Sequence, residues 1–261
     1  MYKIEEPIYY DNKDLNDVAG LLITGYSTYT PPINNLNSFD VALDSKSVSV
    51  TRNEQSRKIT IEGIIRTSDR IDLENSLDTL NRYIKKLNKI LNVPLRGSRY
   101  EFRNTTYQNM VIRDVAGGMA KISVEFLAAD PFSYATELST ALSTTNITSV
   151  PQSLVVNFEG NTEQLPIITI NSFTLEPETS SKQITITNPV TTESITVNRV
   201  FTDAEVVIFN FDTREVTVDD VVVDYSGIFF GVDPDVTALT ITDNFTSRDF
   251  DIKIEYYKRY I

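Results

Sequence analysis

Most of the chain alternates apolar and polar residues with a period of two, a pattern typical of half-buried β-strands. The clearest runs are RKITIEGII at residues 57–65, residues 121–128, and nearly every segment between turn signals from residue 154 onward. Weaker runs in the first half predict strands at residues 23–29, 41–50, 99–102 and 108–115. A hairpin turn is predicted at Gly117 and Gly118. The pattern predicts a mainly β protein.

One segment has the period of an amphipathic helix instead. Leu or Ile recurs at spacings of three and four from Leu73 to Leu91, which places one apolar stripe along a helix face. Ser68 or Asp69 can cap the helix start by accepting free N–H groups, and Pro94 prevents continuation. We predict a helix over residues 69–91. A coiled coil is the alternative, but strands flank the segment, so packing on its own sheet is favoured.

Residues 206–260 consist of short alternating runs broken by Asp-Thr-Arg, Ser-Gly, Asp-Pro-Asp and Asp-Asn. This pattern indicates an antiparallel β-sandwich. A Ser/Thr-rich stretch over residues 133–153 is either a linker or a polar edge strand that opens this second half. We therefore predict two domains, residues 1–132 and residues 133–261.

Composition narrows the possible chemistry. The 261 residues include no Cys and no His, so thiolate metal sites, disulfides and histidine-based triads are excluded. No phosphate-binding loop or G-x-S-x-G motif occurs, and we expect no catalytic residue, no metal and no cofactor. The net charge of −12 lies entirely in residues 136–261, which hold 7 basic and 19 acidic residues. That half should repel nucleic acid and anionic membranes.

Three residue groups are candidate binding features. A basic stretch interleaved with aromatic residues comprises Arg82, Lys85, Lys86, Lys89, Arg96, Arg99, Arg103 and Arg113. It is either an interface for an acidic surface or nucleic acid, or simply a solvated helix end and outward strand positions, which we favour. Asp pairs at 219/220, 233/235 and 249/251 fit turns on a sandwich rim better than a calcium site. Tyr225, Phe229 and Phe230 are the candidate sugar-stacking rings.

An ordered set of segments resembles a known family. The strand RKITIEGII leads into one long helix ending near KILNVPLRG, and AADPF closes the first half at residues 128–132. The second half opens with NFEGNTEQLPIITIN, continues through VIFNFDTREVTVDDVVVDYSGIFFGVDP and finishes with IKIEYYKRY. This order resembles the distal tail protein of long-tailed bacteriophages, the siphovirus-type tail component family.

The resemblance implies a tail-tube-like β-sandwich belt with one long helix, followed by a galectin-like antiparallel β-sandwich that faces outward. Six belts would form a ring, joining the tail tube to the tail-tip hub and offering a docking platform for receptor-binding or other baseplate proteins. The implied partners are thus copies of the chain and other tail proteins. We expect a structural virion protein made in the host cytoplasm, neither an enzyme nor a binder of membranes or specific nucleic acid sequences.

Two departures from the family pattern weaken sugar binding. Asp233-Pro234-Asp235 stands where the family usually has Gly-Asn, and the His and Trp of sugar-binding galectins are absent. The alternatives are a carbohydrate-binding module that attaches to the host cell wall through residues 133–261, or a tail-tube subunit. The tail-tube alternative needs only the belt domain, so the acidic second half argues against it.

Overall fold

The computed structural model describes residues 7–28, 34–40, 47–54, 56–95, 98–171, 180–236 and 238–261. These ranges contain one α-helix, one short 3-10 helix and antiparallel strands, which confirms the mainly β fold predicted from the sequence. Contacts group the chain into two compact units, Met1–Thr136 together with Ile261, and Glu137–Tyr260. Each unit is described below by itself.

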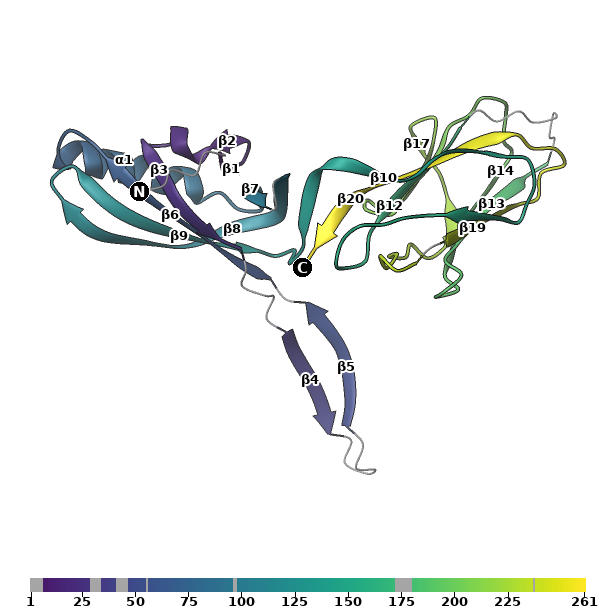
Figure 1. Ribbon diagram of the computed structural model, residues 1–261, viewed down its shortest axis with the longest axis horizontal. Coiled ribbons are helices and arrows are strands. Elements are labelled where there is room, and N and C mark those ends of the chain that lie inside the picture. Colours follow the sequence, from purple (N-terminus) through teal and green to yellow (C-terminus); the bar gives the residue numbers. More distant parts are fainter. Residues whose placement is uncertain are drawn as a thin grey trace. The chain divides into compact units, whose positions relative to one another are not determined.

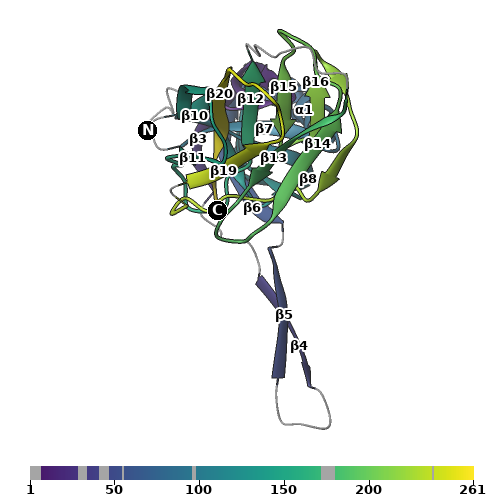
Figure 2. The ribbon, with the colours of Figure 1, turned by 90° about the vertical axis from the view of Figure 1, so that its right-hand side faces the viewer.

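The first unit is built on an antiparallel sheet whose strand order is β3-β6-β9-β8-β7-β1-β2 (Figure 1). Its strands are β1 (Tyr9–Tyr10), β2 (Lys13–Asp14), β3 (Leu21–Ser27), β6 (Arg57–Arg66), β7 (Lys89–Leu95), β8 (Ser98–Ala116) and β9 (Met119–Ala128). The 3-10 helix η1 (Leu15–Asp17) connects β2 to β3. Between β3 and β6, strands β4 (Asn34–Asp40) and β5 (Ser47–Glu54) form a two-stranded sheet of their own, seen as a separate ribbon pair in Figure 2.

Strand alternation places the apolar face of this sheet against helix α1 (Arg70–Ile84). β6 and β9 pair over their full lengths, and Ile59, Ile61 and Ile65 of β6 are buried in one core with the helix. The predicted strands at 57–65 and 121–128 are therefore confirmed. The predicted strand at 23–29 corresponds to β3, and its last residue lies outside the described residues. The prediction at 41–50 is described only from residue 47, within β5.

The predicted helix over residues 69–91 is wrong at its C-terminal end. Asp69 does cap it, accepting a hydrogen bond from the Asp72 N–H at 2.9 Å, but the helix ends at Ile84. Asn88 has a left-handed φ of 53°, which turns the chain into β7. Leu87 is 67% exposed, whereas Leu91 is fully buried as a strand residue. The helical spacing of Leu91 was coincidental, because residues 89–95 also alternate and sheet pairing with β8 decides their conformation.

β8 joins the two strands predicted at 99–102 and 108–115 into one strand of 19 residues. Register shifts after Tyr107 and Arg113 interrupt its pairing with β9. Such irregularities break the alternation, which explains why the sequence pattern divided the strand. Gly117 has a φ of 55° in the hairpin turn to β9, as the sequence predicted, because glycine adopts this conformation without a Cβ clash.

The second unit is a sandwich of two antiparallel sheets. One has the strand order β17-β16-β15-β12-β20-β10 and the other β11-β19-β13-β14-β18. The strands are β10 (Ser133–Ile147), β11 (Gln152–Val155), β12 (Pro166–Asn171), β13 (Lys182–Thr187), β14 (Ser194–Arg199), β15 (Val207–Asn210), β16 (Glu215–Val218), β17 (Val221–Val222), β18 (Tyr225–Gly227), β19 (Ala238–Asp243) and β20 (Phe250–Tyr260).

A single core fills the space between the two sheets of the second unit. Ile168 and Phe209 from one sheet and Ile186 and Ile241 from the other are fully buried in the same cluster. The Ser/Thr-rich stretch is strand β10 and not a linker. It begins in the first unit, where residues 133–135 pair with β8, and continues into the second. The two compact units therefore divide within a strand, between Thr136 and Glu137, four residues beyond the predicted boundary.

Candidate assembly surfaces

The described residues include no candidate metal centre. Among them, no three His, Cys, Asp or Glu side chains are placed to hold a metal ion. They also include no helix with the length and apolar character of a membrane span. The prediction that the chain has no catalytic residue, metal or cofactor stays a prediction.

Part of the basic stretch of the first unit is paired with acidic side chains. Lys86 and Lys89 both reach Asp11, with Nζ to carboxylate distances of 2.5 and 3.2 Å. Hydrogen bonds from these lysines hold the pKa of Asp11 below its usual range, and the bond to Asp11 raises the pKa of Lys86. Sequence reasoning missed Asp11 because it lies 75 positions from Lys86, although adjacent strands and the helix end bring the two together.

The arginines of the same stretch are also engaged locally. Arg103 binds Glu101 at 2.8 Å and its guanidinium lies 3.9 Å from the Tyr134 ring centroid. Arg99 stacks on Tyr9 at 4.7 Å. Arg82, Lys85 and Arg113 are exposed, while Arg96 lies outside the described residues. Part of the stretch is thus engaged locally, and the choice between an interface and solvated positions stays a prediction.

A tyrosine pair anchors the end of α1 to strand β1. Buried Tyr10 donates its hydroxyl hydrogen bond to the Lys86 carbonyl, and Tyr83 donates to the Tyr10 carbonyl. Their rings meet edge to face with centroids 6.2 Å apart. Burial raises the pKa of Tyr10 to about 12, with a further contribution from the Asp11 carboxylate. The arrangement is a structural clamp that fixes the helix end on the sheet.

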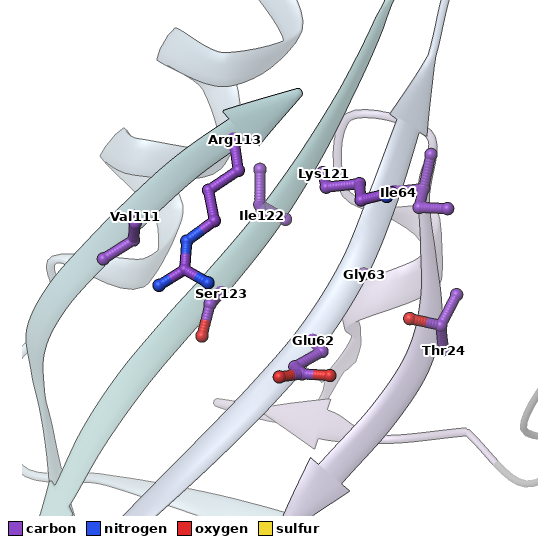
Figure 3. Close-up of a pocket in the computed structure, with 9 residues that line it drawn as sticks. All are labelled: Thr24, Glu62, Gly63, Ile64, Val111, Arg113, Lys121, Ile122 and Ser123. Atoms are coloured by element: carbon purple, nitrogen blue, oxygen red, sulfur yellow. The ribbon is translucent and has the colours of Figure 1, made fainter. Parts of the chain in front are cut away.

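A shallow hollow lies on the sheet face that points away from α1 (Figure 3). It encloses about 140 Å³. Side chains of four adjacent strands line it: Thr24 of β3, Glu62 and Ile64 of β6, Val111 and Arg113 of β8, and Lys121 and Ser123 of β9. Ligand pockets usually measure about 300–1,000 Å³, so this hollow is too small for a substrate site. The sequence signal for it was only the outward polar position on each strand.

The three Asp pairs of the second unit do not converge. Asp219 and Asp220 both have left-handed φ values, and the Asp219 carboxylate accepts a hydrogen bond from the Val206 N–H at 2.9 Å. Asp249 accepts from the Asn146 side chain, and Asp251 lies within β20 opposite Asn171. These pairs occupy turns and strand ends, which agrees with the rim interpretation.

The three aromatic residues considered for sugar stacking do lie together, but unequally. Phe230 is buried in the core, Phe229 is half-buried, and only Tyr225 is exposed, at 43%. Phe229 meets Tyr225 at 4.9 Å and Phe211 at 5.2 Å between centroids, both edge to face. The accessible ring of the cluster is therefore Tyr225, which is linked to the core through Phe229. A single exposed ring is not a stacking platform.

The second unit, with its acidic surface and sandwich core, has a recognisable family. Residues 159–260 match the model of the siphovirus-type tail component, C-terminal domain. The match covers most of the second unit. This confirms the resemblance to the distal tail proteins of long-tailed bacteriophages. No curated protein matches the chain.

Among solved structures, the likeness of fold covers both units. Dit (gp 19.1) of phage SPP1 has the same fold, with a TM-score of 0.70 at 14% identity over 98% of this chain and 99% of that one. That protein is described as a paradigm of the hub adsorption apparatus in phages that infect Gram-positive bacteria.

More distant matches come from the phage p2 baseplate in its activated conformation. A chain solved with strontium gives a TM-score of 0.42 at 9% identity, covering 94% of this chain and 92% of that one. A chain solved with calcium gives 0.41 at 10% identity, covering 93% and 92%.

Proposed function

We propose that this chain is a siphovirus-type tail component and forms a homohexameric ring at the distal end of a phage tail. The ring joins the tail tube to the tail-tip hub and provides a docking platform for receptor-binding or other baseplate proteins. Its role is structural and not enzymatic, and the chain is made in the host cytoplasm before assembly into the virion. The observation that carries the proposal is the family match over residues 159–260, combined with whole-chain likeness to the fold of SPP1 Dit.

Charge and packing support this role. The first unit holds 17 basic and 17 acidic residues, so copies of it can pack together without strong mutual repulsion. A closed ring joins unlike faces head to tail and therefore needs a rigid subunit. The sheet-and-helix core and the clamp of Tyr10 and Tyr83 supply that rigidity.

Native mass measurement of the purified chain tests the ring. The expected species is a hexamer, with a mass of six times the 29.5 kDa of the chain, either alone or after addition of the tail-tube protein. A strictly monomeric chain at high concentration that forms no ring with tail partners would contradict the proposal. Long stacked tubes of the purified chain would instead favour the tail-tube alternative.

Sugar binding is an alternative that no contact among the described residues favours. A glycan array of bacterial cell-wall sugars probed with the full chain tests it. Binding that is lost on changing Tyr225→Ala, with the ring intact, would support a carbohydrate role for the second unit.

A further inference from the structure

Exposed apolar side chains are concentrated in one short segment of the second unit. Val221, Val222, Tyr225 and Ile228 are 65, 63, 43 and 61% exposed. We call these four residues the apolar edge. The described residues include thirteen exposed large hydrophobic side chains, and four of them lie within these eight positions. Isolated surface hydrophobics are ordinary, but a contiguous group marks an interaction site.

The apolar edge joins the outermost strands of both sheets. Among the described strands, β17 pairs only with β16, and β18 pairs only with β14. Folded proteins usually protect such edges with Lys, Pro or a covering loop. No Lys or Arg occurs between Arg214 and Arg248, and no Pro between Pro189 and Pro234, so this edge carries neither protective residue.

The fold itself holds these side chains in the exposed position. The Val223 N–H bonds the Val216 carbonyl, and the Ile228 N–H bonds the Ser194 carbonyl, each at 2.9 Å. Gly227 has a φ of +98°, and a Cβ there would lie 2.2 Å from the Ser194 carbonyl oxygen. The edge is therefore a fixed, preorganised surface, and binding it requires little ordering of the backbone.

The charged residues within the segment that forms the apolar edge all have one sign. Asp219, Asp220 and Asp224 are exposed and interspersed with its apolar residues. With no basic residue in this part of the sequence, the surface attracts cationic groups and repels phosphate backbones and anionic lipids. The neutral first unit of a second copy is a poor match, since it offers no excess of positive charge.

We propose that the apolar edge binds a segment of another tail protein, one that presents apolar side chains flanked by Lys or Arg. Apolar burial then supplies affinity, while the flanking cations meet Asp219, Asp220 and Asp224 and set specificity. The inference rests on the proposed docking role of the ring and assigns that role to a surface.

Photo-cross-linking in assembled tails tests the surface. Benzoylphenylalanine replaces Val222 or Ile228, and the matched control replaces Val190, which is 71% exposed in the turn between β13 and β14. The expected result is an adduct at 222 and 228, absent at 190, with one tail protein. Mass spectrometry should locate it in a peptide that holds apolar residues next to Lys or Arg. No adduct, an adduct with another copy of this chain, or attachment through an acidic peptide would overturn the proposal.

A charge reversal sharpens the test. The double change Asp220→Lys and Asp224→Lys should lower the adduct yield roughly tenfold, because like charges face each other across the interface. Asp233→Lys with Asp235→Lys, in another exposed turn of the same unit, should leave the yield unchanged. An equal loss of adduct yield in both double variants, or a loss in neither, would contradict specific binding at the apolar edge. Native mass of each variant separates this outcome from failure of the ring, which would count against the proposed function instead.

Discussion

The two units differ in the balance and the local pairing of their charged residues. In the first unit the 17 acidic and 17 basic residues balance, and many are paired locally, as in Asp11 with Lys86 and Lys89, or Lys58 with Glu125 at 2.6 Å. The second unit holds 19 acidic and 7 basic residues and therefore keeps uncompensated negative charge. A neutral surface permits packing against identical copies, whereas an acidic surface disfavours it and selects partners of opposite charge.

The cores also differ. The first unit buries one face of a sheet under a helix that is capped and clamped at its two ends. The second unit buries the inner faces of two sheets against each other without a helix among its described residues. The first design relies on particular polar contacts at the helix ends, and the second on apolar area, so different substitutions should weaken each unit.

The largest effects should come from removing a core ring in either unit. Phe126→Ala and Phe209→Ala each leave a cavity where a fully buried side chain stood, and each should cost about 3–5 kcal/mol in its own unit. Calorimetry should show two transitions, with Phe126→Ala lowering one and Phe209→Ala the other. If both substitutions lower the same transition equally, the two units unfold together, which would contradict the expectation that each substitution weakens only its own unit.

The clamp should make the first unit sensitive to alkali. The folded-state pKa of Tyr10 is raised from 10.0 to about 12, so its contribution to stability is fully present below pH 10 and lost as the pH rises through 12. Tyr10→Phe should flatten this part of the stability profile, measured by denaturant unfolding between pH 9 and 12. Tyr9→Phe, on the neighbouring position of β1, is the control and should retain the wild-type profile.

The helix cap should have a moderate effect confined to the first unit. Asp69→Ala removes the acceptor of the Asp72 N–H and should lower the free energy of unfolding by about 0.5–2 kcal/mol. Asp69→Asn keeps an acceptor oxygen and should recover most of this loss in urea unfolding. An equally destabilised Asn variant would show that the residue acts through its charge and not as a cap.

The smallest effects should come from exposed ion pairs. Lys258 binds Glu159 at 2.5 Å in the second unit, and surface pairs of this kind contribute about 0–1 kcal/mol. Glu159→Gln should therefore change the free energy of unfolding by less than about 1 kcal/mol.

Asp11→Asn removes a carboxylate whose pKa is lowered in the folded state. The contribution of this carboxylate to stability is present at neutral pH and lost as the pH falls through that pKa, so the substitution should destabilise the first unit at pH 7 and have less effect at pH 3. Chemical denaturation at pH 7 and pH 3 measures the free energy of unfolding of both variants. A loss larger than about 1 kcal/mol for Glu159→Gln at pH 7 would show that its ion pair stabilises the second unit more than an ordinary surface pair does.

The sequence predicted those elements whose burial follows a regular period. β6 alternates and was predicted at its observed position, and the helix start was recognisable from Asp69 followed by the Leu73 to Ile84 pattern. The helix end was not predicted, because Leu87 and Leu91 satisfy the helical spacing although one is exposed and the other belongs to a strand. Pairing with β8, a contact that local spacing does not encode, decides that conformation.

The candidate surfaces were less predictable than the fold. The basic stretch looked continuous in sequence, but Asp11 and Glu101 neutralise part of it through contacts that only the folded sheet creates. Tyr225 was noted from the sequence as a ring, yet its role as part of an exposed apolar edge depends on β17 and β18 being terminal strands. Exposure at a sheet edge is set by which strands pair, and a period-two pattern is the same at an edge as at a centre.

Electron microscopy of isolated tail tips tests the ring most directly. We expect a single closed ring of six copies of this chain between the tail tube and the tip hub. Tail tips without this chain, or the chain stacked in many rings along the tube, would contradict it.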